Sequence, residues 1–314
     1  MQLPFKTVDV FTTTPYIGNP LAIIRVPSSL RNILTEEQKQ KIAREFNLSE
    51  TTFLHEPVPG TEDGTADVDI FTPISRLAFA GHPTIGTAMY VSQHPEMYPG
   101  IKQLKMLAGT IPFTYSEHSG RVSVNVPHAF RIHRSRLAHP FPGKEDGSGS
   151  ATVPLVSIVK GMAFNLVSMR DVQALGLPTK GLLPVEECYK AEYLDRGSGW
   201  DVGYTGTFYY TDLGIEEGIE GDAGVRKLRT RSIGTREDPG TGSASCALCC
   251  YLAIVARQSS AEQVQKFHLT QGVEMGRRCD IFITVQTTED GKGIESVELS
   301  GTAVIVMKGS LTID

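Results

Sequence analysis

The sequence has few of the features that mark membrane or nucleic-acid-binding proteins. No uninterrupted apolar run approaches the roughly 20 residues that a membrane-spanning helix needs. The opening stretch MQLPFKTVDVF lacks a basic segment followed by an apolar one, so we expect no signal peptide and a cytoplasmic location. The net charge of −5 at pH 7 argues against nucleic acid as the main partner. We expect neither a nucleic-acid nor a membrane partner.

Cysteine is scarce, and the five cysteines follow no disulfide or zinc-site spacing. Three of them lie in CALCC, residues 246–250, inside a continuous apolar run. No second pair of Cys or His ligands matches them, so we interpret them as small buried residues of a helix. A P-loop is also missing, because GTGSAS lacks the required lysine, and no G-x-G-x-x-G follows a strand.

What is present describes an ordinary globular protein. The chain has 314 residues, of which 40% are hydrophobic and 21% are charged. A chain of this length can bury ample core and divides into roughly two domains.

Strand and helix patterns occur in a repeated order. FKTVDVF and NPLAIIRV predict a strand hairpin, and a helix is expected from Thr35, which forms a capping box with Gln38, to Asn47. In both halves, strand patterns precede an apolar helix, and an isolated glycine (Gly109 or Gly272) with more strand pattern follows it. We therefore predict an α+β fold of two similar halves, each a mixed or antiparallel sheet with one apolar helix against it.

Each apolar helix is introduced by a related heptapeptide, HPTIGTA at residues 82–88 and DPGTGSA at residues 238–244. Proline suits a helix start, and small residues let a ligand approach the first-turn N–H groups, where the helix dipole favours an anion. This interpretation places His82 and Asp238 at equivalent positions, as titratable groups beside a substrate carboxylate or phosphate. The alternative is that both are only N-terminal helix caps.

Two segments near the middle of the chain differ in composition. PFPGKEDGSGSATVP, residues 140–154, is rich in glycine, serine and charge and predicts a mobile loop near the domain junction. HAFRIHRSRLAH, residues 128–139, carries three His and three Arg. We interpret it as a solvated surface strand, with an anion-binding patch as the alternative.

Four motifs, in order along the chain, carry a family resemblance: GNPLAI, AREFNLSETTF, FTPISRLAFAGHPTIGTA and EDPGTGSASCAL. Together they resemble the PhzF-like family of phenazine biosynthesis, within the diaminopimelate-epimerase-like superfold. The resemblance implies two pseudo-symmetric domains, each a barrel-like sheet wrapped around a central helix, with the active site in the cleft between them. It predicts domains at residues 1–128 and 129–300, with a final strand at 301–314 that returns to the first domain, and a homodimer.

The resemblance also implies the site residues. Glu50 of NLSET is the expected proton carrier, assisted by His82 of AGHP and by Asp238 and Ser243 of EDPGTGSA. The same motifs imply the substrate-binding residues Asn19, Ser49, Gly81, Thr241 and Gly242. The implied activity is the isomerisation of a small carboxylic acid, cyclic or an aromatic precursor, without cofactor or metal.

Moving a proton between carbons needs a carboxyl group that gains and loses a proton near neutral pH. We expect desolvation to raise the pKa of Glu50, because the apolar segment TTFL follows it. Epimerases of the superfold use two cysteines, but none stands at His82 or Asp238, so a two-thiol racemase is not expected. A catalytically silent binding or scaffold protein remains an alternative, as does an epimerase or lyase acting on another substrate.

Overall fold

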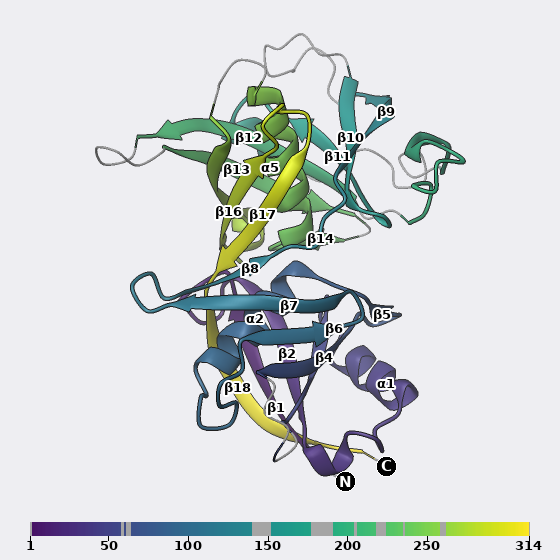
Figure 1. Cartoon of the computed structure of the whole chain (residues 1–314), viewed down its shortest axis with the longest axis vertical. Coiled ribbons are helices and arrows are strands. Elements are labelled where there is room, and N and C mark those ends of the chain that lie inside the picture. Colours follow the sequence, from purple (N-terminus) through teal and green to yellow (C-terminus); the bar gives the residue numbers. More distant parts are fainter. Residues whose placement is uncertain are drawn as a thin grey trace. The chain divides into compact units, whose positions relative to one another are not determined.

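The computed structural model describes residues 2–57, 60, 64–139, 152–176, 191–203, 206–217, 224–234, 236–257 and 262–313. Contacts divide the chain into two compact units. The first unit is formed by Met1–Val126 with Leu299–Asp314, and the second by Pro127–Glu298. Strands dominate both units (Figure 1).

The first unit is a sheet with two α-helices. Its strands are β1 (Gln2–Val10), β2 (Asn19–Val26), β3 (Thr51–His55), β4 (Thr65–Phe71), β5 (Arg76–Leu77), β6 (Gln103–Met106), β7 (Gly109–Ser116), β8 (Arg121–Asn125) and β18 (Ala303–Thr312). Its helices are the 3-10 turn η1 (Ser28–Leu30), α1 (Glu36–Phe46) and α2 (Gly81–Ser92). The last strand, β18, pairs antiparallel with β1 from Gln2↔Thr312 to Val10↔Ala303, so the two ends of the chain lie side by side in this unit.

The second unit has the same character. Its strands are β9 (Arg131–Ala138), β10 (Thr152–Val159), β11 (Met162–Ser168), β12 (Gly206–Glu216), β13 (Val225–Ile233), β14 (Glu237–Asp238), β15 (Val264–Gln271), β16 (Cys279–Thr287) and β17 (Ile294–Gly301), the last of which continues into the first unit. Its helices are α3 (Val172–Leu175), α5 (Gly242–Arg257) and the 3-10 turns η2 (Ala191–Leu194) and η3 (Val273–Met275).

The order of strand pairing is the same in the two units. In the first, β1–β2 is antiparallel, β2–β3 parallel, β3–β4 antiparallel, β4–β6 parallel and β6–β7 antiparallel. In the second, β10–β11, β11–β12, β12–β13, β13–β15 and β15–β16 repeat this series. The repeated topology confirms the predicted two halves of similar architecture.

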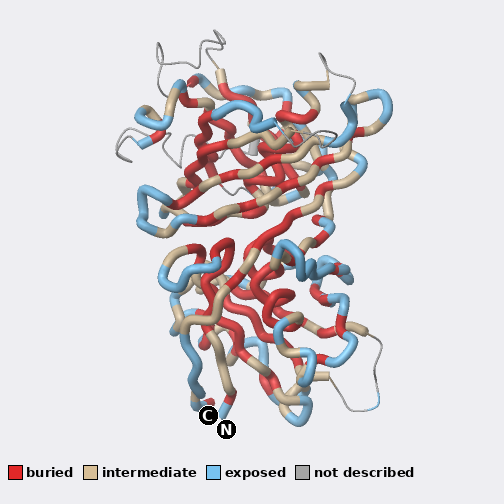
Figure 2. Tube along the Cα trace, turned by 90° about the vertical axis from the view of Figure 1, so that its left-hand side faces the viewer, coloured by how far each residue is buried: buried red, intermediate tan, exposed pale blue. Residues whose placement is uncertain are grey.

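An apolar helix occupies the same place in each unit. Helix α2 connects the parallel strands β4 and β6, and α5 connects β13 and β15. Every residue of α2 from Gly81 to Val91 is buried, and the helix contacts β1, β2, β3, β7, β8 and β18. Because a helix that is apolar on all sides is stable only inside a core, the strands must surround it. Figure 2 shows the buried residues concentrated along these central segments.

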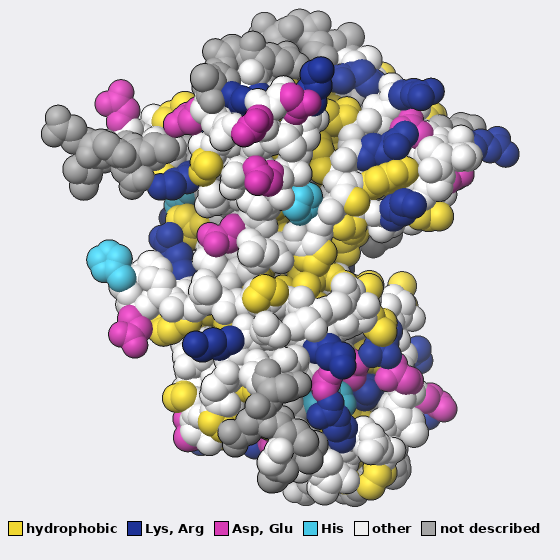
Figure 3. Space-filling model, viewed as in Figure 1, with side chains coloured by type: hydrophobic (Ala, Val, Ile, Leu, Met, Phe, Trp, Pro, Cys, Tyr) yellow, Lys and Arg dark blue, Asp and Glu magenta, His cyan; other side chains and the backbone are white. Residues whose placement is uncertain are grey.

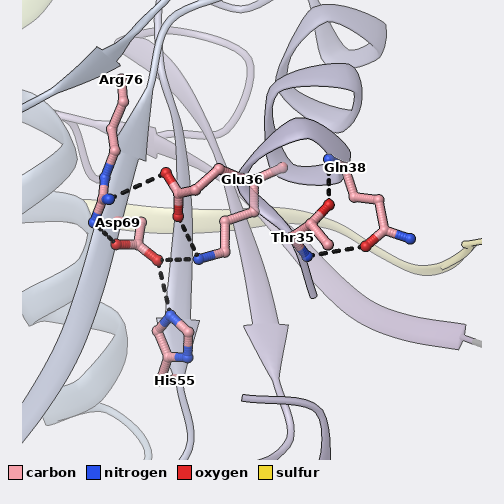
Figure 4. Close-up of polar contacts among 7 residues, drawn as sticks. Thr35, Glu36, Gln38, His55, Asp69 and Arg76 are labelled. Carbon is pink, nitrogen blue, oxygen red and sulfur yellow. Dashed lines mark hydrogen bonds and ion pairs between the residues drawn. The ribbon is translucent and has the colours of Figure 1, made fainter. Parts of the chain in front are cut away.

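Helix α1 begins and ends as the sequence predicts. The Thr35 hydroxyl accepts a hydrogen bond from the Gln38 N–H at 3.2 Å, and Gln38 Oε1 accepts from the Thr35 N–H at 3.0 Å (Figure 4). Asn47 ends the helix in the left-handed conformation, at φ 51°. The capping box therefore marks the start of α1, and the left-handed backbone of Asn47 marks its end.

A buried charge network attaches α1 to the sheet (Figure 4). Asp69 on β4 accepts from Lys39 Nζ of α1 at 2.6 Å, from His55 Nε2 of β3 at 2.9 Å, and from Arg76 of β5. Burial by itself would raise the pKa of Asp69, but hydrogen bonds from His55 and Lys39 outweigh it and hold the pKa well below its usual value. Figure 3 shows acidic and basic side chains gathered on this part of the first unit.

The cysteines of α5 are buried, as predicted. Cys246, Cys249 and Cys250 are each 0% exposed, and burial raises the pKa of all three thiols. Cys188 lies outside the described residues, as do residues 140–151 of the predicted loop. Within the described residues, no helix combines the length and apolar composition needed to span a membrane.

Strand β9 contains the His- and Arg-rich segment. Its outward side chains Arg134 and Arg136 are exposed, and Figure 3 shows Lys and Arg gathered over β9 and β10, so the predicted solvated face is confirmed. His133 instead points into the unit and contacts Ser157 Oγ at 2.8 Å, with Asp195 Oδ2 3.6 Å from its Nδ1. Ser157 is 1% exposed, so this Ser–His–Asp series is closed to a substrate and serves the packing of the sheet.

Candidate active site

The first unit brings four of the predicted site residues together. Asn19 begins β2, Ser49 and Glu50 immediately precede the parallel strand β3, and His82 is the second residue of α2. Ser49 Oγ lies 3.5 Å from Asn19 Oδ1, and Asn19 Nδ2 lies 3.4 Å from His82 Nδ1. The same His82 nitrogen lies 3.3 Å from Glu50 Oε2. Gly81 adjoins this group as the first residue of the helix.

The backbone before Asn19 fixes where that side chain lies. Gly18 has φ +85°, and a Cβ atom there would lie 2.5 Å from the Val10 carbonyl oxygen, so only glycine fits. Asn19 pairs with Val10 at the end of the hairpin and is 0% exposed. The GNP turn therefore presents a fully buried amide to the imidazole.

His82 is neutral at neutral pH. It is 4% exposed, and burial lowers its pKa to about 3, although a hydrogen bond to the Pro20 backbone partly offsets the effect. The distance to Glu50 would suit an ion pair. The contact between Glu50 and His82 nevertheless involves a neutral ring, because a buried imidazolium would lose its hydration. The side chain of Glu50 is 17% exposed and so keeps some access to solvent or substrate.

The second unit holds the other carboxylate. Asp238 ends β14, residues 239–241 form a turn, and α5 begins at Gly242. The Thr241 hydroxyl donates to Asp238 Oδ2 at 2.5 Å. Ser243 follows as the second residue of α5 and is half-buried.

The expectation that His82 and Asp238 occupy equivalent positions is wrong. The short strands β5 and β14 each end four residues before their helix begins (77 to 81 and 238 to 242). Gly81 therefore corresponds to Gly242, and His82 corresponds to Ser243. In the heptapeptides His82 aligns with Asp238, but in the repeated fold it aligns with Ser243, five residues later. Asp238 instead lies on the strand before its helix.

The two helix starts are suited to anions, as predicted from their small residues. The N–H groups of a first turn have no partner within the helix, and the first bonds within these helices are Thr84 N to the Ala80 carbonyl and Ser245 N to the Thr241 carbonyl. Neither first turn contains an acidic residue. The positive end of each helix dipole is therefore not neutralised by its own side chains.

Sequence reasoning missed Gln271, the last residue of β15. It is 0% exposed and bonds to both Asp238 and Thr241. The only hint in the sequence is that it precedes Gly272, an isolated glycine in an apolar setting. No group of three or more His, Cys, Asp or Glu among the described residues could hold a metal ion.

Two units of one topology, each wrapped around an apolar helix whose start adjoins acid–base side chains, define an epimerase-like fold. The chain belongs to the PhzC–PhzF family. The family model described as phenazine biosynthesis-like protein matches residues 8–155 and 220–309.

Known proteins resemble the chain over its full length. It is 29% identical to trans-2,3-dihydro-3-hydroxyanthranilate isomerase of Pseudomonas aeruginosa over 97% of this chain and 98% of the relative. A PhzF-family phenazine biosynthesis protein of Bacillus anthracis superposes with a TM-score of 0.71 at 19% identity, covering 100% of both chains. A hydroxyproline epimerase of Agrobacterium vitis has a TM-score of 0.60 at 16% identity, covering 99% of this chain and 92% of the other.

These likenesses confirm the predicted fold class. The fold is mixed α/β, mostly strands, and at least 99% of this chain matches each of these solved structures. At the level that the family defines, the protein is an isomerase or epimerase.

Proposed function

We propose that the protein is a cofactor-independent isomerase that moves a proton between carbons of a small cyclic carboxylic acid, with Glu50 as the proton carrier. The observation that supports this most directly is the 3.3 Å contact between Glu50 Oε2 and His82 Nδ1. The name of the Pseudomonas aeruginosa relative supports the substrate class.

A neutral imidazole can accommodate both protonation states of Glu50. The neutral ring lies 3.3 Å from Glu50 Oε2 and, unlike an imidazolium, does not hold the carboxyl group in its ionised form. Glu50 can therefore take a proton from one carbon and return it to another. We propose that partial burial raises the pKa of Glu50 towards the range where both states are populated.

The groups of the second unit have a complementary role in this proposal. Ser243 and the first-turn N–H groups of α5 bind the substrate carboxylate and stabilise the enolate-like anion that forms when carbon loses its proton, and Asp238 assists Glu50 in the proton transfer. Asn19, Ser49, Gly81, Thr241 and Gly242 contact the same substrate. This role requires the residues of both units to act on one substrate molecule, as the family resemblance predicts.

Solvent exchange tests the proposed reaction. Trans-2,3-dihydro-3-hydroxyanthranilate and a panel of cyclic carboxylic acids are incubated with the protein in heavy water, and carbon-bound deuterium is measured by mass spectrometry. The isomerase predicts deuterium on carbon together with a displaced double bond. An acid that raises the melting temperature but gains no deuterium would indicate the silent binding protein instead.

The position of the label separates the remaining alternative. An epimerase returns deuterium to the carbon that lost the proton, with inverted configuration, whereas the isomerase labels a different carbon. The homodimer and the cytoplasmic location remain predictions, and light scattering of the purified protein tests the first of them.

A further inference from the structure

The side chain of Gln271 bonds to the turn from Asp238 to Thr241. Its side chain is 0% exposed and comes from the end of β15, which pairs with β13 and β16. Gln271 Oε1 accepts from the Thr241 N–H at 3.1 Å, and Gln271 Nε2 donates to the Asp238 carbonyl at 2.8 Å. The amide thus joins both ends of the turn to the sheet.

These two backbone partners settle which way the amide points. A backbone N–H can only donate and a backbone carbonyl can only accept, so Oε1 must face Thr241 N and Nε2 must face Asp238 O. Any reversal would set two donors against each other at one end and two acceptors at the other.

The amide orientation in turn sets the direction of the Thr241 hydroxyl. Gln271 Nε2 also lies 3.0 Å from Thr241 Oγ1, and because Nε2 can only donate, that oxygen accepts. The single hydroxyl hydrogen is then available for Asp238 Oδ2, 2.5 Å away. The result is a hydrogen-bond chain of one direction, from the Gln271 amide through Thr241 to the Asp238 carboxylate.

The next residue, Gly272, contacts the same turn through its backbone. Gly272 has φ +74°, and a Cβ atom there would lie 2.6 Å from the Pro239 carbonyl oxygen and 2.4 Å from the Arg277 carbonyl oxygen. The backbone of Gly272 therefore contacts the backbone of the turn at a distance that no other residue allows.

We propose that Gln271 is a positioning residue: it anchors the turn from Asp238 to Thr241 and directs the Thr241 hydroxyl onto the Asp238 carboxylate. The contacts of Gln271 do not depend on any function, whereas the importance of Gln271 for catalysis rests on the function proposed above. The chain favours ionised Asp238, because a hydroxyl that must donate stabilises a carboxylate over a carboxylic acid.

The test follows the titration of Asp238 in the full-length protein. The side-chain carboxyl carbons of Asp are labelled with ¹³C, the Asp238 signal is assigned from its loss in Asp238→Asn, and its midpoint is measured by NMR. Gln271→Met keeps the length of the side chain and removes the amide. The matched control is Gln265→Met on the same strand, where Gln265 Nε2 donates to the Ala253 carbonyl at 3.2 Å, outside the turn.

Nearby charges stay the same in all variants. Glu237 precedes Asp238 and pairs with Arg231 of β13, whose Nε lies 2.8 Å from Glu237 Oε1, and Arg277 follows in the turn after Gly272. We expect the midpoint of Asp238 to rise by about one pH unit in Gln271→Met and to stay at the wild-type value in Gln265→Met. An unchanged midpoint in Gln271→Met, or an equal rise in the control, would overturn the proposal.

The other link of the chain provides a second variant pair. Thr241→Val removes the hydroxyl and is expected to raise the midpoint as Gln271→Met does, whereas Thr241→Ser keeps the hydroxyl and should restore the wild-type value. If Gln271→Met does not fold, this pair of variants tests the proposal instead. Equal Asp238 midpoints in Thr241→Val and Thr241→Ser would reject it. These titrations do not measure turnover. The proposal for Gln271 can therefore fail while the isomerase proposal holds, and the reverse is also possible.

Discussion

His82 and Ser243 are each the second residue of the helix that connects two parallel strands of their unit. The fold thus places an imidazole in one unit where the other has a hydroxyl. The carboxylates come from outside the helices, Glu50 from the residue before β3 and Asp238 from β14. The duplicated fold therefore carries an asymmetric set of acid–base groups.

The buried neutral His82 predicts a pH-dependent stability. The unfolded histidine binds a proton near pH 6.5 and the folded one only near pH 3, so the unfolded state binds more protons between these values. Stability should therefore fall by about 2 kcal/mol between pH 7 and pH 5 from this residue alone. Urea unfolding at both pH values measures it, with His82→Asn as the variant that lacks the effect. The account is contradicted if wild type and variant lose equal stability.

Replacing Asp69 should strongly destabilise the first unit. Asp69→Asn leaves the buried Lys39 ammonium without its main counter-charge, and we expect a loss of about 3 kcal/mol at pH 7 in urea unfolding. The control is Asp67→Asn on the same strand, whose partner is the partly exposed Arg31 and whose loss should stay below about 1 kcal/mol. Similar losses for the two variants would argue against the network as the anchor of α1.

The Asp69 network also has a defined dependence on acid. The pKa of Asp69 is lower in the folded protein than in the unfolded chain. The contribution of Asp69 to the free energy of unfolding is therefore complete above about pH 4 and disappears as the pH falls further. The stability difference between wild type and Asp69→Asn should therefore shrink below pH 4. A difference that stays constant down to pH 3 would show that the carboxylate charge is not what stabilises the unit.

Gly272 should tolerate no side chain. In Gly272→Ala the new Cβ would meet two backbone oxygens, and the residue would keep a positive φ, so we expect at least about 3 kcal/mol of destabilisation in thermal or urea unfolding. Gly276→Ala is the control, because Gly276 has φ +67° but no atom within 4 Å of an added Cβ. It should lose only about 1 kcal/mol. Equal losses would mean that backbone conformation, and not the contact with Pro239, governs this site.

The elements that sequence predicts well are those set by local chemistry. The hairpin of β1 and β2, the capping box of Thr35 and Gln38, and the apolar helices all follow from residues within a few positions of one another. The family motifs identify the residues that gather around Glu50, because each motif places its residue at or just before the start of a strand or helix.

What sequence cannot supply is contact between distant residues. Lys39 and Asp69 are 30 positions apart, and Gln271 lies 30 positions after Thr241, so no local pattern relates them. The register of the repeat is lost for a similar reason. DPGTGSA resembles HPTIGTA in letters, but β14 extends to Asp238 and delays the start of α5 until Gly242.

The central claim is that Glu50 carries the proton. Glu50→Gln keeps the shape of the side chain but cannot exchange a proton with carbon, and Glu45→Gln changes an exposed glutamate of α1 as the matched control. For an acid that wild type labels in heavy water, deuterium incorporation should fall at least about 100-fold in Glu50→Gln, with binding retained and Glu45→Gln unaffected. Labelling by Glu50→Gln at the wild-type rate would contradict the account.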